Sequence, residues 1–498
     1  MCNVHEYICF SRMDPNFCII EFYRVFYFFC FITTGTSLKL KKDRQTVVIL
    51  SFDGFRYDYV ERVNMRHFKE FARNGVKADS LKSAFVTKTL PNHFTMVTGL
   101  YEESHGIISN YMYDPKYAEY FDPVLSSKDS KWWSSAVPIW IENELQYLQD
   151  GNRTRKSATI YWPGSEATYN GHWQYYTEKK YNQNYTFKAR VDKIIDLLLE
   201  PDPVNFIACY FEEPDYTSHK YGPDHENTSI VLQKVDGLLG YYINKLKKAN
   251  LYTKINTIIV SDHGMMFVKK ENVKTLTNYL HPDAYNIYSY GTFLLIQPKH
   301  GLLEEVYFNL TKVAHLKTYK KESIPSQWHY KTNRRITDIF SVADPGYYIS
   351  PNENVTAEIL SDFGDHGYDN NIKEMHGIFL AHGPAFKNGL NVGLVENIDL
   401  YVLMCEILEL KPNPNNGSLP RVLGMLQEKT LFSIIKQNPT FVVILLSICG
   451  LFLIGVLCAC SLSCFRSIKK SAKYAALYQK EVPLSEWSED EEFFTRSN

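Results

Sequence analysis

The chain has 498 residues, of which 45% are hydrophobic and 22% charged, and its formal net charge is −1. This composition is typical of a folded globular protein and excludes a mostly disordered or collagen-like chain. A near-neutral chain without a basic, aromatic-rich stretch gives no support for nucleic-acid binding, and we expect no nucleic-acid partner.

The first segment in chain order is an apolar run at residues 25–32, which follows Arg24 and precedes the small residues 34–37. This pattern indicates a secretory signal peptide. We therefore expect residues 1–37 to form a signal region, with cleavage between Gly35 and Leu38. Translation from Met13 would give a more conventional signal.

A β-branched run at Thr46–Ser51 predicts a buried strand that ends just before Asp53. Further along, Pro91 just inside an apolar helical run predicts a helix that starts near Thr89. Thr89 is either a plain helix cap or a nucleophile whose hydroxyl attacks phosphorus. The backbone amides at that helix start, together with Asn110, would then hold the phosphoryl oxygens.

Asp215 and His219 come soon after a second predicted strand, Asn205–Phe211. They are four residues apart, so on one helical turn their side chains point the same way. Read alone, this pair is better explained as a surface ion pair than as a metal site. Carboxylate oxygen and imidazole nitrogen are nevertheless ligands that suit zinc.

Two Asp-His-Gly sequences follow, at residues 262–264 and 365–367. Asp262 and His263 come directly after a third predicted strand, Ile255–Val260. His366 lies in a loop bounded by glycines. Each cluster is a weak signal by itself, but all of them fall at strand ends or in glycine-bounded loops. Together they predict two zinc ions with a hydroxyl nucleophile between them, which is machinery for cleaving phosphate esters.

The remaining elements predict the fold class. Helical patterns at residues 189–199 and 230–248 alternate with the strands, and residues 291–296 and 377–381 are further strand candidates. This alternation predicts an α/β fold with a central β-sheet flanked by helices on both faces. Ligands bind such sheets beyond the carboxyl ends of the strands, where the Asp residues lie. We expect one large catalytic domain with insertions over residues 38–430.

Two cysteines, Cys209 and Cys405, lie in the long middle of the chain. Both sit in apolar runs, so buried free thiols are favoured over a disulfide between them.

The C-terminal region predicts a membrane anchor. No charged residue occurs from Thr440 to Phe465, which is long enough for one membrane-spanning helix. Lys and Arg residues follow at once and place the tail, residues 466–498, in the cytoplasm. The expected topology is a single-pass type I cell-membrane protein with its catalytic domain outside the cell. Glycosylation sequons between the two apolar segments agree: Asn152, Asn184, Asn227, Asn309, Asn354 and Asn416.

Several longer motifs resemble one family. They are SFDGFR (51–56), TKTLPNHF (87–94), TGLYEESHGI (98–107), WPGS (162–165), SDHGM (261–265) and GDHGYDN (364–370). These resemble the ectonucleotide pyrophosphatase/phosphodiesterases, within the alkaline-phosphatase-like superfamily, over residues 45–425. The C-terminal anchor and short length are most similar to the bis(5'-adenosyl)-triphosphatase subgroup.

The resemblance implies a ligand set and a mechanism. One zinc would take Asp215, His219 and His366, and the other would take Asp53, Thr89, Asp262 and His263. Thr89 would form a covalent phosphothreonine intermediate, and AMP would be released from substrates such as diadenosine tri- and tetraphosphate. No obligate protein partner is implied.

The substrate pocket departs from the family pattern. Where the family usually has an aromatic residue after the nucleophile, this chain has Leu90, whereas Tyr181 keeps the aromatic ring on the opposite side of the base. A base held between two rings would therefore lie between one ring and an aliphatic side chain. Trp162 belongs to the pocket by the same resemblance, and Glu166 follows WPGS where the family has Asp. We expect weaker or less purine-selective binding with catalysis retained.

Two alternatives remain open. A choline-phosphate ester phosphodiesterase is one, because family members differ mainly in the pocket. A catalytically inert receptor or adhesion ectodomain is the other. A sulfatase is not expected, because a sulfatase needs a modifiable Cys or Ser in its own motif and this chain has Thr89 at that position.

Overall fold

The computed structural model describes residues 45–146, 155–178, 182, 184–428 and 439–478. One compact unit holds the described residues up to Gln427, and the helix α15 (Pro439–Tyr478) belongs to a second unit. The predicted signal region, residues 1–37, and the end of the predicted tail lie outside the described residues.

The compact unit is built on an eight-stranded mixed sheet. The strands in spatial order are β18 (Leu390–Glu396), β2 (Val76–Lys82), β17 (Phe379–His382), β8 (Asn256–Val260), β1 (Val47–Phe52), β7 (Phe206–Phe211), β5 (Ser157–Ile160) and β6 (Tyr176–Thr177). Strand β1 pairs in parallel with both β7 and β8. Strand β17 runs antiparallel to both of its neighbours.

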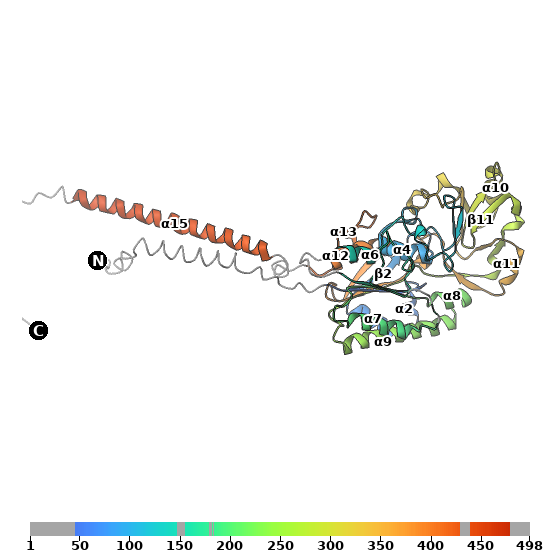
Figure 1. The fold of residues 1–498 in the computed structure, drawn as a ribbon, viewed down its shortest axis with the longest axis horizontal. Helices are drawn as coiled ribbons and strands as arrows, with labels where there is room; N and C mark the ends of the chain where they lie inside the picture. The colour runs from blue at the N-terminus through green and yellow to red at the C-terminus, as the bar shows by residue number, and fades with distance from the viewer. Residues whose placement is uncertain (1–44, 147–154, 179–181, 183, 429–438, 479–498) are drawn as a thin grey trace, which may run out of the picture. The chain divides into compact units, whose positions relative to one another are not determined.

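Helices cover both faces of this sheet (Figure 1). On one face lie α3 (Arg66–Arg73), α7 (Phe187–Leu198) and α9 (Glu226–Lys248), and on the other lie α4 (Thr89–Thr98), α6 (Ile139–Leu145) and α12 (Leu400–Leu408). Every residue of β1 is buried, and successive side chains alternate between the two cores: Ile49 packs into one and Leu50 into the other. A continuous apolar run is therefore what a central strand covered on both faces requires.

A second, four-stranded antiparallel sheet is inserted between β8 and β17. Its strands in spatial order are β11 (Tyr285–Ser289), β12 (Phe293–Pro298), β14 (Ile339–Ala343) and β13 (Leu316–Lys320). With α10 (Leu303–Leu310) it encloses a core of its own. The hairpin β11–β12 ends in the short loop of residues 290–292, beside the site described below.

The predicted α/β class with helices on both faces is confirmed. The three predicted strands before the Asp clusters match β1, β7 and β8 within one residue, and the two predicted helices match α7 and α9. The pattern did not predict that β17 is antiparallel, because alternation and burial carry no strand direction. Cys209 and Cys405 are both buried and free, as expected.

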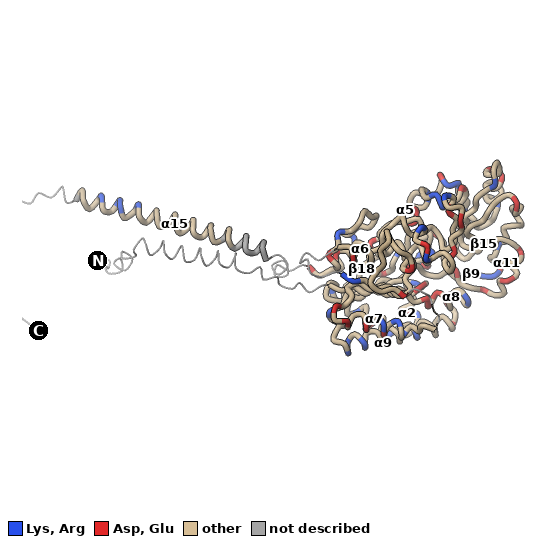
Figure 2. The backbone as a smooth tube through the Cα atoms, in the orientation of Figure 1, with Lys and Arg blue, Asp and Glu red and all other residues tan. Residues whose placement is uncertain are grey.

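The helix α15 extends further than the predicted membrane span, which ended at Phe465. It continues through Arg466 and three lysines to Tyr478, since these long side chains are good helix formers. Figure 2 shows the basic residues gathered in its C-terminal part. Among the described residues it is the one helix long and apolar enough to cross a membrane, over Gly450–Leu477.

Candidate metal centre and nucleophile

Three carboxylates meet at one edge of the large sheet because β1, β7 and β8 are parallel neighbours. Asp53 directly follows β1, Asp262 follows β8, and Asp215 is the first residue of α8 (Asp215–Tyr221), which comes after β7. The amide of Asp215 donates to the carbonyl of Asp53 at 3.0 Å. The amide of Gly54 donates to Oδ1 of Asp262 at 3.2 Å. The carboxyl ends of the strands thus bring together residues 53, 215 and 262, as predicted.

Gly54 allows this close approach. Its φ is +63°, and a Cβ at this position would lie 2.8 Å from the Cβ of Asp215. A larger residue would both be strained and push Asp215 away from Asp53.

Asp215, His219 and His366 form one group with metal-ligand geometry, since their ligand atoms lie within 4.8 Å of one another. Nε2 of His219 is 3.4 Å from Oδ2 of Asp215, and Nε2 of His366 is 3.6 Å from Oδ1. His366 follows the short strand β16 (Phe363–Asp365). The two imidazole Nε2 atoms are only 3.1 Å apart.

Asp53, Asp262 and His263 form a second such group, and all three are buried. Nε2 of His263 lies 2.9 Å from Oδ2 of Asp262 and 3.3 Å from Oδ1 of Asp53. The rings of His263 and His366 stack with centroids 3.4 Å apart. The two groups are therefore adjacent.

Backbone carbonyls set the orientation of all three imidazoles. Nδ1 of His219 donates to the carbonyl of Gly364 at 2.8 Å, Nδ1 of His263 to that of Gly264 at 2.9 Å, and Nδ1 of His366 to that of Thr87 at 2.7 Å. A carbonyl oxygen only accepts, so each Nδ1 carries the proton. Each Nε2 then presents a lone pair to the carboxylates, which is the arrangement of metal-ligating histidines.

The site leaves three buried carboxylate oxygens without a hydrogen-bond partner: Oδ1 of Asp53, Oδ1 of Asp215 and Oδ2 of Asp262. An unpaired buried charge is costly unless a cation or a donor compensates it. Oxygen and imidazole donors at this spacing fit divalent transition metals such as zinc. The donor set therefore fits a bound metal at both groups.

The pKa values reflect the close packing of these ionisable groups. Burial opposes protonation of His263, but the Asp262 carboxylate outweighs it and raises the pKa of that imidazole. Burial, followed by repulsion from Asp262 and Asp215, raises the pKa of Asp53 well above its ordinary value. Burial also opposes ionisation of Asp262, but the imidazoles of His263 and His93 outweigh it and lower the pKa of that carboxyl. Burial and the neighbouring His263 and Lys88 lower the pKa of His366, so its ring is neutral, as a metal ligand must be.

Thr89 is the first residue of α4, and its Oγ1 lies 3.3 Å from Nε2 of His263. One turn further, His93 donates from Nδ1 to the carbonyl of Thr89 at 2.8 Å and accepts from Oγ of Ser51 at Nε2, also at 2.8 Å. Trp162 packs edge-on against His93 and donates to its carbonyl at 3.2 Å. Trp162 is only 1% exposed, so it supports α4 from within the core, and its contact with substrate stays a prediction.

Asn110 lies beside the nucleophile. Its Oδ1 accepts from the amide of Leu90 at 2.9 Å, which leaves its own NH2 group to donate elsewhere. Pro91 has no N–H, and the amide of Asn92 donates to the carbonyl of Lys88. Within this first turn, the amide of Thr89 is thus the one that remains for a phosphoryl oxygen. The sequence analysis predicted that several backbone amides at the helix start would bind the phosphoryl oxygens, whereas the structure leaves only this one available in the first turn.

Other predicted site residues are placed as follows. Leu90 is half-buried and packs against the core beneath α4. Glu166 accepts from Ser127 Oγ at 2.6 Å. Tyr181 and the sequon Asn152 lie outside the described residues. Asn184, Asn354 and Asn416 are exposed, and Asn227 and Asn309 are half-buried; their glycosylation stays a prediction.

The sequence analysis missed two residues at this site. The phenol of Tyr210, in β7, donates to Oδ2 of Asp53 at 2.5 Å. Lys88 forms an ion pair of 3.0 Å with Asp365, next to both the nucleophile and His366. In the sequence, only their positions near predicted site residues could have indicated a role in the site. Tyr210 otherwise looks like any other residue of a buried strand.

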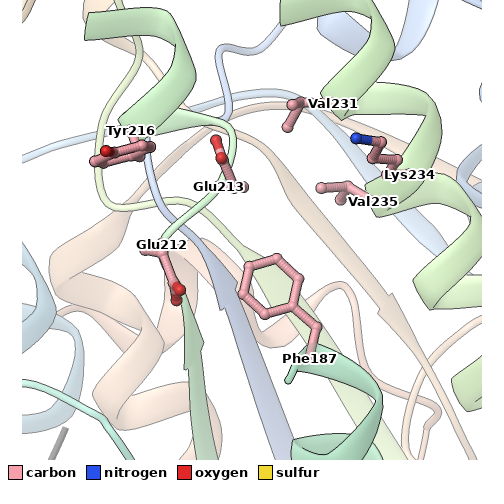
Figure 3. Close-up of a pocket in the computed structure, with 7 residues that line it drawn as sticks. All are labelled: Phe187, Glu212, Glu213, Tyr216, Val231, Lys234 and Val235. Atoms are coloured by element: carbon pink, nitrogen blue, oxygen red, sulfur yellow. The ribbon is translucent and has the colours of Figure 1, made fainter. Parts of the chain in front are cut away.

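A separate cavity of about 430 Å³ lies beside α8 (Figure 3). It is lined by Phe187, Glu212, Glu213, Tyr216, Val231, Lys234 and Val235. None of the predicted metal ligands lines it, although Glu213 and Tyr216 flank Asp215 in sequence.

Comparisons with known proteins agree with this geometry. The family model "Type I phosphodiesterase / nucleotide pyrophosphatase" matches residues 47–369. The human ectonucleotide pyrophosphatase/phosphodiesterase family member 5 is 39% identical over 82% of this chain and 83% of its own length. The bis(5'-adenosyl)-triphosphatase enpp4 of Xenopus laevis is 41% identical over 75% of this chain and 80% of its own.

Among solved structures, murine ectonucleotide pyrophosphatase/phosphodiesterase 5 aligns with a TM-score of 0.73 and 41% identity, covering 77% of this chain and all of that one. That structure is an inactive threonine-to-alanine form in complex with AMP. The chain therefore belongs to the type I phosphodiesterase/nucleotide pyrophosphatase family and is a hydrolase.

Proposed function

We propose that this protein is a zinc-dependent ecto-phosphodiesterase that hydrolyses dinucleoside polyphosphates, such as diadenosine tri- and tetraphosphate, and releases AMP through a covalent phosphothreonine at Thr89. The observation that carries the proposal is the hydroxyl of Thr89, 3.3 Å from His263, where two Asp/His groups converge. This arrangement suits a nucleophile at a two-metal site.

The two groups assign the ligands. Asp215, His219 and His366 would hold one zinc, and Asp53, Asp262, His263 and the oxygen of Thr89 would hold the other. When bound, the zinc ions would favour the ionised form of the threonine hydroxyl and offset negative charge on the phosphoryl group.

The chain's own residues supply attack and positioning. Thr89 Oγ1 forms a bond to phosphorus as the bond from phosphorus to the bridging oxygen of the leaving nucleotide breaks, and water later cleaves the phosphothreonine. The NH2 group of Asn110 and the amide of Thr89 are the donors available to the phosphoryl oxygens. His93 fixes the carbonyl of Thr89 and hence the start of α4.

Relatives support nucleotides as the substrate class. The Xenopus and human relatives at about 40% identity are named for bis(5'-adenosyl) triphosphate hydrolysis. A solved neighbour holds AMP. The helix α15 and the exposed sequons support a type I protein at the cell membrane with its catalytic unit outside.

The direct test is product analysis with the full chain purified in detergent. Diadenosine triphosphate, ATP and a choline-phosphate ester are compared, with and without a chelator. We expect AMP from the dinucleotide, loss of activity with the chelator, and recovery on addition of zinc. The Thr89→Ala variant should lose turnover but keep its metal. Preferential cleavage of the choline ester, or undiminished turnover by Thr89→Ala, would overturn the proposal.

A further inference from the structure

Two tyrosine rings stand exposed at the rim of the candidate site. Tyr111 is 52% exposed and directly follows Asn110, the predicted phosphoryl-binding residue. Tyr290 is 44% exposed and starts the loop between β11 and β12. Neither ring was part of the pocket predicted from the sequence.

The two tyrosines belong to neighbouring segments. β3 (Met112–Asp114) and β11 are in contact, and the rings of Tyr113 and Tyr288 stack with centroids 4.8 Å apart. Tyr111 comes two residues before Tyr113, and Tyr290 comes two residues after Tyr288. The phenol of Tyr290 adds to burial and Asp122 in raising the pKa of Tyr111, which also indicates that the two rings are close.

The loop that carries Tyr290 is fastened to the site at both ends. Before it, Ser289 Oγ lies 3.4 Å from Oγ of Ser109, next to Asn110. After it, Thr292 Oγ1 donates to the carbonyl of the metal-ligand candidate His366 at 2.7 Å. Tyr290 is therefore held between the phosphoryl-binding segment and the Asp215/His219/His366 group.

The loop backbone is also fixed from behind. Gly291 exchanges two hydrogen bonds with Ile349, at 3.1 and 2.8 Å. A Cβ on Gly291 would lie 2.9 Å from the ring of Tyr348, so the loop rests directly on that ring. Because the loop backbone is already held in place, stacking of a ligand ring on Tyr290 would cost the loop little additional conformational entropy.

Charge near the nucleophile favours a ligand with a ring. Lys88 precedes Thr89, but it is already paired with Asp365 at 3.0 Å. Its charge is thus largely compensated before any polyphosphate arrives. Base–aromatic stacking then remains as a source of affinity for the part of the substrate beyond the reacting phosphorus.

We propose that Tyr111 and Tyr290 form a stacking platform for the purine base of the leaving nucleotide. Leu90 lies next to Thr89 and is predicted to contact the base of the nucleotide that is transferred to Thr89 and then released as AMP. The leaving nucleotide of a dinucleotide substrate carries a second base, which the platform would bind. This inference rests on the proposed function. It makes the enzyme selective for nucleoside-capped polyphosphates over those that end in a bare phosphate.

Binding to the full-length Thr89→Ala chain, which should bind without turnover, tests the platform. Affinities for diadenosine triphosphate and for AMP are measured by calorimetry with zinc present. Adding Tyr111→Ala or Tyr290→Ala should weaken dinucleotide binding about 10-fold each, the effect of one lost base–ring stack, and leave AMP binding unchanged. Tyr290→Phe should retain dinucleotide affinity because it keeps the ring.

Phe308→Ala is the matched control, since this ring is 62% exposed but lies on α10, which packs against β13. Tyrosine variants that behave like Phe308→Ala, or that weaken AMP and dinucleotide binding equally, would overturn the platform. If the wild-type chain releases AMP from diadenosine triphosphate, such a result rejects the platform alone. If the wild-type chain acts only on the choline ester, the proposed function and the platform both fail.

Discussion

Nε2 of His366 lies 3.1 Å from Nε2 of His219, although both imidazoles already donate from Nδ1 to backbone carbonyls. Two lone pairs at this distance repel unless a cation or a proton lies between them. A proton on His366 is disfavoured because burial lowers the pKa of its imidazole. Together with Asp215, the two histidines form a group whose donor atoms fit a metal ion.

Removing one ligand of this group should remove one metal. We expect the purified chain to carry two zinc ions and the His219→Ala variant to carry one, as measured by elemental analysis. Zinc-free protein should also unfold at a lower temperature, because a ligand at 1,000 times its Kd stabilises the folded state by about 4 kcal/mol. The exposed His300→Ala is the control and should keep both ions. Equal zinc content in all three proteins would reject this ligand assignment.

Tyr210 should tune the second metal position. Its phenol donates to Asp53 at 2.5 Å and so orients the carboxylate that faces His263. Tyr210→Phe should weaken zinc binding about 10- to 100-fold, the usual effect of losing a hydrogen bond to a metal ligand. Competition with a chromophoric chelator measures this, and excess zinc should restore kcat.

Tyr242→Phe is the matched control, because that buried phenol pairs with Thr257 in the core and touches none of the ligands. It should leave zinc affinity unchanged. The same loss in both variants would mean that Tyr210 acts only through the stability of the fold.

Leu90→Phe should restore the ring that the family usually has after the nucleophile. A base stacked on this ring would gain about 1–3 kcal/mol, so KM for adenine substrates should fall at least several-fold with kcat little changed. Leu90→Met, which keeps an aliphatic side chain of similar volume, should leave KM as it is. An unchanged KM in Leu90→Phe would show that position 90 does not contact the base.

Glu142 should make stability fall as the pH rises. Burial raises the pKa of this carboxyl from 4.5 to about 7, against the opposing hydrogen bond from Tyr401. Between these two values the folded chain holds a proton that the unfolded chain has lost, so its contribution is present below pH 4.5 and lost by about pH 7. At about 1.4 kcal/mol per pKa unit, the loss is about 3 kcal/mol.

Glu142→Gln removes this titration and keeps an acceptor for Tyr401. Urea unfolding at pH 5 and pH 8 should show that the free energy of unfolding of the variant, relative to that of the wild type, is greater at pH 8 than at pH 5. Glu322→Gln, at an exposed carboxylate, serves as the control and should show no such difference. A constant gap between Glu142→Gln and the wild type at both pH values would contradict the raised pKa.

The central sheet was predictable because β1 and β8 are fully buried, β7 is buried except at Tyr210, and all three are largely apolar runs. The four-stranded sheet was harder to predict, since only its strand β12 was among the candidates and β13 is mostly polar, although β14 is apolar along most of its length. The end of α15 was missed because the loss of apolar character at Arg466 marks the end of a membrane span and leaves the helix free to continue.

The position of Asp53, Asp262 and His263 at strand ends predicted that these residues converge, whereas their assignment to one metal ion was implied by the family resemblance. Contacts between distant segments were beyond the sequence alone. Ser289, at the start of the loop that carries Tyr290, contacts Ser109 only because the inserted sheet packs against the large one, and Trp162 turns inward because α4 covers it. No local pattern reports such tertiary packing.

The covalent step can be observed directly. Full-length enzyme is mixed with diadenosine triphosphate, quenched in acid within milliseconds, digested and analysed by mass spectrometry. We predict a transient adduct with the mass of one AMP group on the peptide that contains Thr89, absent from the Thr89→Ala variant and from zinc-free protein. Turnover that continues with no adduct on that peptide, or an adduct on another residue, would contradict the assignment of Thr89 as the nucleophile.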